Sequence, residues 1–230
     1  MKLTARLQSI VEFVQKNSIV ADIGTDHGYI PKYLIDMEIS KLVIASDISK
    51  GSLDKTISYL EEENLSEYIM PRLGNGLEVI KPFEVDTIII AGMGGLLITE
   101  ILENDKKKLD SYLDYILQPM VGADELRKYL LNNHFSILQE KIVKEGNKYY
   151  EIIHARRGLQ EVSSDIEYEI SPLWLESEDS IWKEMINIRL LALESIHNDL
   201  EDKDSERSKE RFIQLKEKIS KYKEVLKIEG

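Results

Sequence analysis

Short apolar runs rich in β-branched residues alternate with helical patterns through the first 155 residues of this chain. The runs that predict strands are 19–22, 42–47, 69–73, 87–91, 115–118, 136–143 and 149–155. Helical patterns at 31–37, 51–63 and 96–107 lie between the earlier runs. Because strands that are apolar almost throughout have both faces covered, the alternation predicts an α/β fold with a parallel sheet between two layers of helices.

The last two predicted strands differ from the others in their connection. Only the turn Glu-Gly-Asn-Lys at 145–148 joins them, which leaves no room for a helix, so we expect an antiparallel hairpin. Five parallel units closed by such a hairpin form the Rossmann-like seven-stranded sheet of class I methyltransferases. A nicotinamide dehydrogenase would more often continue with further parallel units.

The strand pattern stops after Gly158, and a second region follows. Ser171-Pro172 predicts a helix start. Two apolar stripes come next, the first on Trp182, Met185, Ile186, Leu193, Ile196 and Leu200, and the second on Phe212, Leu215, Ile219, Tyr222 and Leu226. The second stripe has the spacing of a coiled-coil seam. We therefore expect two domains, a cofactor-binding domain at 1–158 and a helical coiled-coil hairpin at 159–230.

Charge is distributed unevenly, although the net charge of −12 argues against non-specific binding to nucleic acid. Residues 163–202 carry 11 acidic and 2 basic side chains, whereas residues 203–230 carry 9 basic and 6 acidic ones. The basic side chains of residues 203–230 could bind the phosphates of a nucleic acid. On the simpler interpretation, they are only solvated surface charges. The chain has no Cys, and its four His show no metal-ligand spacing. Without a signal-peptide or membrane-spanning pattern, we expect a cytoplasmic protein that needs no metal.

The loop after the first predicted strand has the sequence DIGTDHGY and carries the sharpest local signal. Asp22 ends the strand, Gly24 permits a tight turn, and the amides at the next helix start can donate to an anionic group. A dehydrogenase would bind a pyrophosphate here over G-x-G-x-x-G, but the carboxylate of Asp26 would repel it. A sulfonium would not be repelled. Thr25, His27 and Gly28 complete the predicted cofactor loop.

Three further loops follow the second, third and fourth predicted strands. Asp47, next to Ile48, can accept hydrogen bonds from the ribose of an adenosyl or a dinucleotide cofactor. Asn75 and Gly76 leave room for an adenine. Ala91 lies at the end of the fourth strand, and Gly92, Met93 and Gly94 follow it, where class I methyltransferases receive the methyl acceptor.

Each of these loops taken alone has the simpler interpretation of an ordinary strand-to-helix turn. Together they lie at the carboxyl ends of parallel strands, where open α/β sheets bind ligands. The joint placement therefore predicts a site for a nucleoside cofactor with an acceptor slot beside it.

The segments DIGTDHGYIP, ASDIS, GNGLEVI, AGMGG and LQP together resemble the bacterial tRNA (adenine-22-N1)-methyltransferase family, over nearly the whole chain. The resemblance implies methyl transfer from S-adenosylmethionine to N1 of an adenine in the D-arm of tRNA. We expect a monomer whose partner is tRNA rather than DNA or a membrane. Two positions depart from the family pattern, which has Asp at Asn75 and Asn at Met120.

The chemistry of such a transfer places few demands on the protein. N1 of adenine already carries a lone pair, so alignment is the main task. The product is a cation, which a carboxylate would stabilise. We assign that role to Asp26, with Tyr29 positioning a base that must be unpaired or flipped. Alternatives are another RNA, a protein or a small molecule as acceptor, a non-catalytic binding module, and a nicotinamide oxidoreductase, which Asp26 disfavours.

Overall fold

The computed structural model describes residues 2–201, 203 and 205–228 of the 230-residue chain. These residues form two compact units, Met1–Ser163 and Ser164–Gly230. The sequence pattern placed the division five residues earlier, after Gly158. No helix among the described residues is long and apolar enough to cross a membrane.

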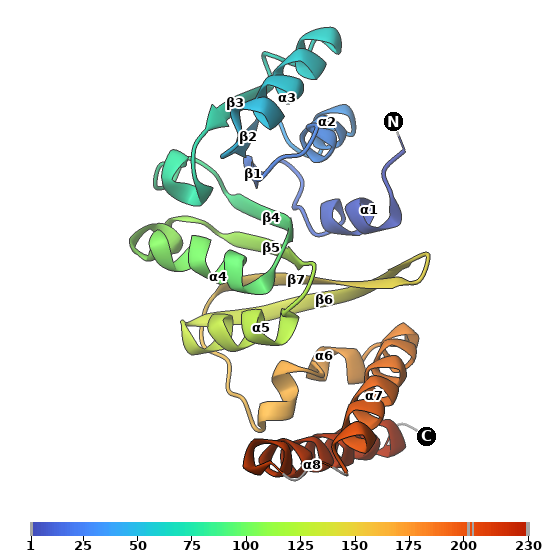
Figure 1. Cartoon of the computed structure of the whole chain (residues 1–230). Helices are drawn as coiled ribbons and strands as arrows, with labels where there is room; N and C mark the ends of the chain where they lie inside the picture. The colour runs from blue at the N-terminus through green and yellow to red at the C-terminus, as the bar shows by residue number, and fades with distance from the viewer. Residues whose placement is uncertain (1, 202, 204, 229–230) are drawn as a thin grey trace. The chain divides into compact units, whose positions relative to one another are not determined.

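A seven-stranded sheet forms the centre of the first unit (Figure 1). Its strands are β1 (Val20–Ile23), β2 (Val43–Asp47), β3 (Ile69–Leu73), β4 (Thr87–Met93), β5 (Asp114–Pro119), β6 (Phe135–Glu145) and β7 (Lys148–Arg157). They lie in the order β3-β2-β1-β4-β5-β7-β6, with β1 to β5 parallel and β7 antiparallel to both of its neighbours. The predicted Rossmann-like methyltransferase sheet and its terminal hairpin are confirmed.

Helices cover both faces of the sheet (Figure 1). On one face lie α1 (Ala5–Val11), α2 (Tyr29–Asp36) and α3 (Lys50–Glu62), and on the other lie α4 (Gly95–Asn104) and α5 (Ala123–Asn132). Short 3₁₀ helices η1 (Gly76–Val79) and η2 (Lys106–Ser111) complete the connections. The expected helix at 96–107 therefore ends earlier, and η2 takes up its last residues.

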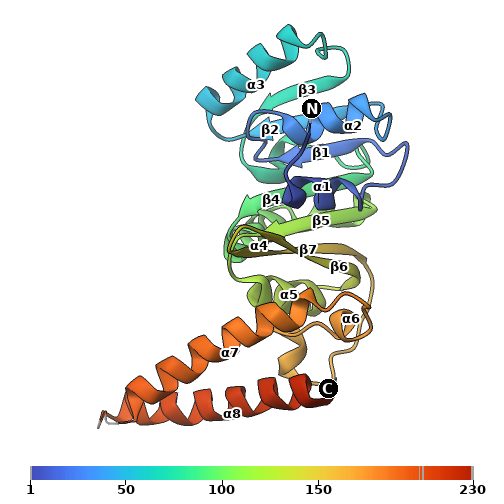
Figure 2. The same ribbon diagram turned by 90° about the vertical axis from the view of Figure 1, so that its right-hand side faces the viewer.

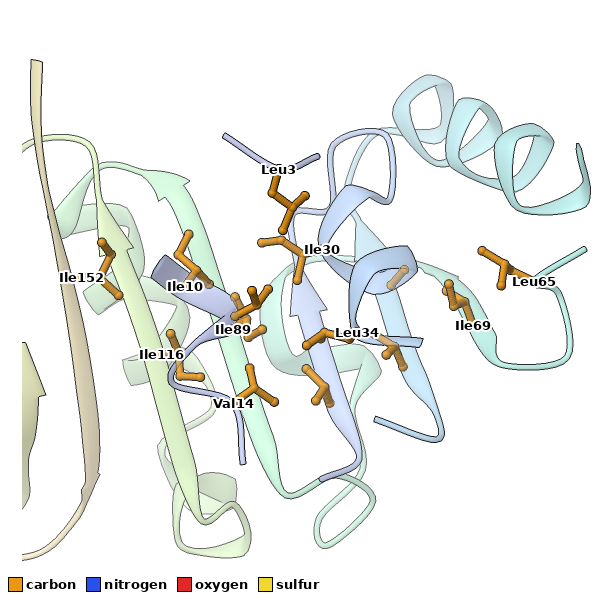
Figure 3. Close-up of a cluster of buried hydrophobic side chains, with 14 of the residues drawn as sticks. Leu3, Ile10, Val14, Ile30, Leu34, Leu65, Ile69, Ile89, Ile116 and Ile152 are labelled. Atoms are coloured by element: carbon orange, nitrogen blue, oxygen red, sulfur yellow. The ribbon is translucent and has the colours of Figure 1, made fainter. Parts of the chain in front are cut away.

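The first helical layer is held to the sheet by an apolar core, shown in Figure 3. Ile10 of α1 and Leu34 of α2 are completely buried against Ile89 of β4 and Ile116 of β5. A fully buried side chain of this kind contributes about 1.5–3 kcal/mol. Because α1 joins this core, the amino-terminal residues are fixed against the same edge of strands that carries the site.

Helix α5 packs on the other face and carries a buried charge. The Arg127 guanidinium lies between two carboxylates of the β6–β7 hairpin, with Nη2 at 2.7 Å from Glu140 and 2.5 Å from Glu151. All three side chains are almost completely buried. Since one buried cation faces two buried anions, the cluster ties the helix to the hairpin in a single arrangement.

The second unit is helical, with η3 (Asp165–Tyr168), α6 (Pro172–Leu175), α7 (Ile181–Leu200) and α8 (Glu206–Ile228). The hydroxyl of Ser171 accepts from the amide of Leu173 at the predicted helix start. Helices α7 and α8 lie side by side (Figure 2), with the His197 ring stacked on Phe212 at 4.0 Å between centroids.

The apolar stripe of α7 differs in part from the expected one. Leu190 is buried and continues the stripe from Ile186, whereas Ile196, placed in the stripe by the sequence pattern, is 47% exposed. The aromatic contact of His197 takes the position next to α8 at that level of the helix. On α8 the predicted seam holds, because Leu215, Ile219 and Tyr222 are buried.

Candidate functional site

A cavity of about 720 Å³ opens where β1, β2 and β4 end at their carboxyl edge. Of the predicted site residues, those that line it are Asp22, Gly24, Asp26, Tyr29, Asp47, Ile48, Asn75, Gly76, Ala91, Gly92 and Met93. The four loops that the sequence singled out are therefore brought together around one space. Its volume lies in the range of ordinary small-molecule sites.

Four predicted residues lie outside the cavity lining. Thr25 is buried beneath the first loop, and Gly28 is the N-cap of α2, packed near Thr56. His27 is exposed and has a positive φ of 62°. Gly94 is the N-cap of α4, where a Cβ would touch Val121. These residues shape the loops rather than face the space between them.

The first loop is a clamped turn. The amides of Gly24 and Thr25 both donate to the carbonyl of Ser46 in β2, each at 2.8 Å. Gly24 has φ +76°, and a Cβ there would stand 2.1 Å from Cε of Met93. The turn therefore needs glycine for its backbone conformation and for the close approach of another part of the cavity wall.

Asp22 is the buried acid of the site. Burial raises the pKa of its carboxyl to about 6, and the neighbouring Asp47 adds to the rise, while the side chain of Thr25 opposes it. A cation in the cavity would favour the ionised form of Asp22 and lower that pKa again. The site is thus prepared for a positively charged group.

Asp47 and Asn75 form the wall on the β2–β3 side. Oδ1 of Asp47 accepts from the amide of Ser49 at 2.7 Å, which fixes the carboxylate at the end of the strand. Beside it, the amide of Asn75 donates to Glu78 at 2.5 Å, and this bond closes the first turn of η1. The Asn75 side chain is exposed at the cavity edge.

At the acceptor loop, β4 continues to Met93 through an irregularity in its pairing with β5 between Ala91 and Met93. Gly92 lies there with φ +78°, and its amide donates to Oε1 of Gln118 at 3.2 Å. Leu97 and Met120 line the cavity next to this turn and are both more than 40% exposed. The acceptor side therefore offers an exposed backbone turn beside apolar side chains.

The sequence pattern missed the contribution of the amino-terminal helix. Thr4, Arg6 and Leu7 line the cavity, and Nη1 of Arg6 donates to Oε1 of Gln118 at 2.7 Å. No motif in the amino-terminal residues marked a contact with the strand ends. Ser46, Gly74 and Ile101 also line the cavity without having been singled out.

Asp26 and Tyr29 line the cavity mouth and contact two side chains that lie outside the lining. The Asp26 carboxylate is largely exposed and lies 3.3 Å from Nε2 of His27. The His27 ring is 5.4 Å from that of Tyr29, which meets Tyr59 edge-on at 6.2 Å. A carboxylate beside exposed rings can receive a flat, polar group such as a nucleobase.

Comparisons with known proteins agree with this geometry. Residues 3–153 match the family model described as a methyltransferase domain. The tRNA (adenine(22)-N(1))-methyltransferase of Bacillus subtilis is 32% identical over 98% of both chains. The chain belongs to the tRNA (adenine-22-N1)-methyltransferase family.

Solved structures of this family match 98% of this chain. The Bacillus subtilis m1A22 tRNA methyltransferase matches with a TM-score of 0.91 at 31% identity, over 98% of this chain and 99% of that one. A Streptococcus pneumoniae protein in complex with S-adenosyl-L-methionine matches with a TM-score of 0.86 at 31% identity, over 98% of this chain and 100% of that one. Both units of this tRNA (adenine-22-N1)-methyltransferase family member thus have counterparts in the relatives.

Proposed function

We propose that this chain transfers the methyl group of S-adenosylmethionine to N1 of an adenine in tRNA, at position 22 of the D-arm. The observation that carries the proposal is the single cavity that joins the Asp22–Gly24 loop, Asp47 and the Gly92–Met93 turn. The family and the named activity of its Bacillus subtilis member support the choice of substrate.

The residues present fit S-adenosylmethionine. Glycines at 24 and 76 have positive φ, and the absence of a Cβ lets Met93 and Ile101 pack closely against their backbone in the wall of the cavity. Asp47 is fixed at the end of β2, where it suits the ribose hydroxyls. Asp22 is a buried acid that suits a cationic donor. When bound, S-adenosylmethionine supplies an electrophilic methyl group on a sulfonium.

The side chains at the mouth suit the acceptor. N1 of adenine needs no base to become nucleophilic, so the protein has to align it with the methyl carbon. The exposed carboxylate of Asp26 can accept a hydrogen bond from the N6 amino group and stabilise the positive charge that develops on the ring. Tyr29 offers a ring face, and the Gly92 turn lets the flat base approach the backbone.

A target atom on the Watson–Crick edge requires the base to leave its pair, at a cost of a few kcal/mol. Contacts to the RNA backbone offset that cost. Helix α8 supplies exposed basic side chains for them, including Arg207, Lys216, Lys221 and Lys227. We assign the second unit to tRNA docking and the reaction to a monomer in the cytoplasm.

The test is methylation of tRNA in vitro. The protein is incubated with isotopically labelled S-adenosylmethionine and total bacterial tRNA, and the modified nucleoside is mapped by mass spectrometry. We expect 1-methyladenosine at position 22. An Asp47→Ala variant should bind S-adenosylmethionine more weakly by calorimetry while keeping its circular dichroism spectrum. Label in another nucleoside, or none in tRNA, would refute the proposed substrate.

A further inference from the structure

Arg6 is fixed in the cavity wall from three sides. Its amide donates to Oε1 of Glu145 at 2.5 Å, so the tip of the β6–β7 hairpin holds the first turn of α1. Its guanidinium lies over the ring of Tyr150 in β7, with 5.5 Å from Cζ to the ring centroid. Its Nη1 donates to Gln118 in β5. With its backbone amide held and two contacts to its side chain, Arg6 has little freedom left, and it lines the cavity.

Gln118 connects this guanidinium to the acceptor turn. Its side chain is completely buried, and Oε1 accepts both from Nη1 of Arg6 at 2.7 Å and from the amide of Gly92 at 3.2 Å. Its Nε2 donates to the carbonyl of Pro119 at 2.8 Å. Because both ends of the amide are engaged inside the protein, Gln118 positions Arg6 and Gly92 and has no group left for a ligand.

The Arg6 residue lowers the pKa of the Glu145 carboxyl, first through its amide hydrogen bond and also through its charge, but its guanidinium forms no direct ion pair within the described part of the chain. A guanidinium carries five N–H donors and stays charged at all ordinary pH values. Arg6 uses one of them on the neutral amide of Gln118, and among the residues that the structure describes, no carboxylate other than that of Glu145 feels its charge, and none lies within ion-pair distance of the guanidinium. Nη1 lies 3.9 Å from where a Cβ on Gly92 would stand, next to the acceptor turn. A fixed cation with unused donors on a cavity wall is arranged to bind an oxyanion.

We infer that Arg6 is an oxyanion-binding residue of this cavity, an assignment that rests on the proposed function. The reactants offer two oxyanions of the required chemistry. One is the α-carboxylate of the methionyl part of S-adenosylmethionine, and the other is a phosphate of the nucleotide that enters beside Gly92. Either would form charge-assisted hydrogen bonds with the free N–H groups of the guanidinium.

The first arm of the test uses two nucleosides. S-adenosylhomocysteine has the α-carboxylate, and 5′-methylthioadenosine lacks it. If Arg6 binds the carboxylate, Arg6→Gln weakens S-adenosylhomocysteine binding by roughly 10- to 100-fold in calorimetry and leaves 5′-methylthioadenosine binding unchanged. Equal losses for both nucleosides would show a merely structural role and overturn the inference. Arg6→Lys keeps the charge and should recover part of the loss.

The second arm measures the salt dependence of the KM for tRNA. If Arg6 binds a phosphate, Arg6→Gln lowers the slope of log KM against log salt by about one and leaves S-adenosylhomocysteine affinity unchanged. Lys41→Gln serves as the charge-matched control. Lys41 is exposed and precedes β2, so it lies at the amino-terminal end of that strand, away from the carboxyl ends that carry the cavity. That control should behave as wild type in both arms.

The outcomes separate the two proposals. Methylation of tRNA by the wild type, with neither arm changed in Arg6→Gln, would overturn the assignment of Arg6 alone. A wild type that binds S-adenosylhomocysteine but methylates no tRNA would refute the proposed function, and the nucleoside arm alone would then support or overturn the carboxylate role. If the wild type bound neither nucleoside and no tRNA, both the proposed function and the assignment of Arg6 would be refuted.

Discussion

The thioether methyl of Met93 lies against the backbone of Gly24, at 2.1 Å from the position where a Cβ would be. The two residues belong to the first and fourth loops, so this contact closes the cavity floor between the cofactor loop and the acceptor turn. The contact between Met93 and Gly24 therefore joins the cofactor side of the cavity to its acceptor side. A change at either residue acts on both sides.

Gly24→Ala should weaken S-adenosylmethionine binding at least about tenfold, because the new Cβ would displace Met93 and strain a turn with positive φ. Calorimetry measures the affinity. Gly146→Ala is the matched control, since Gly146 has φ +59° but open space around its Cβ position. It should cost about 1 kcal/mol of stability and leave the affinity unchanged. Equal affinities in the two variants would contradict the role of the Met93 contact.

Binding of S-adenosylmethionine should release protons near pH 6 and none at pH 8. In the free protein the pKa of Asp22 is raised to about 6, so near pH 6 about half of the molecules carry a proton there. A cationic ligand lowers that pKa and expels the proton, whereas at pH 8 the carboxyl is already ionised. Binding enthalpies in buffers of different ionisation heat give the number of protons. Asp22→Asn should abolish the dependence of the binding enthalpy on the buffer. If that dependence persisted in the variant, a group other than Asp22 would be releasing the proton.

Asp26→Asn should slow methyl transfer in a single turnover by roughly 10²-fold while S-adenosylmethionine affinity changes little. The amide keeps the shape of the side chain but removes the charge that faces the developing cation. Rapid-quench assays on a tRNA transcript measure the rate. Asp54→Asn, on the exposed surface of α3 and paired with Lys50, is the control. A wild-type rate in Asp26→Asn would remove Asp26 from the reaction.

Replacing Lys216 and Lys227 on α8 by Gln should raise the KM for tRNA and lower its salt slope by up to about two, with unchanged cofactor affinity. Both side chains are exposed. The matched double variant replaces Lys16 and Lys41, exposed residues of the first unit, and should change neither quantity. If both double variants lose affinity equally, the effect is one of net charge and the second unit has no docking role.

Arg127→Met should destabilise the protein by about 3–5 kcal/mol, because Glu140 and Glu151 would be left as uncompensated buried carboxylates. Urea unfolding followed by circular dichroism measures the loss. Combining the change with Glu140→Gln and Glu151→Gln should restore part of the stability. An unchanged unfolding midpoint in the single variant would show that the cluster is solvated.

The strands were the most predictable part of the fold. All seven expected runs are strands. The apolar runs of β1, β2 and β5 are buried almost throughout, whereas β3 and β6 are exposed in part. Helix α5 was not assigned, although Asp124 and Glu125 in its first turn and Leu126 and Leu130 four residues apart were usable signals. The exposed Ile196 was misplaced because a helical period alone does not show which rows of side chains the neighbouring helix reaches.

For the site, the loops were predictable and the amino-terminal wall was not. Asp22, Asp47 and Gly92 follow strands, and parallel strands bring their carboxyl ends to one edge whatever the sequence between them. Arg6 lies on a helix that is held at that edge by its apolar core contacts and by Glu145, 139 residues later, which accepts the amide hydrogen of Arg6. A contact over such a separation leaves no local pattern in the sequence.

The place of α1 in the cavity wall makes the amino-terminal segment a convenient reporter. Lys2 is exposed and lies only two residues before Thr4, which lines the cavity, and the chain contains no Cys. A single Cys introduced at Lys2 would take a thiol-reactive fluorophore at one defined position. Ligand entry would then be recorded as a change in its emission, in an otherwise unmodified protein.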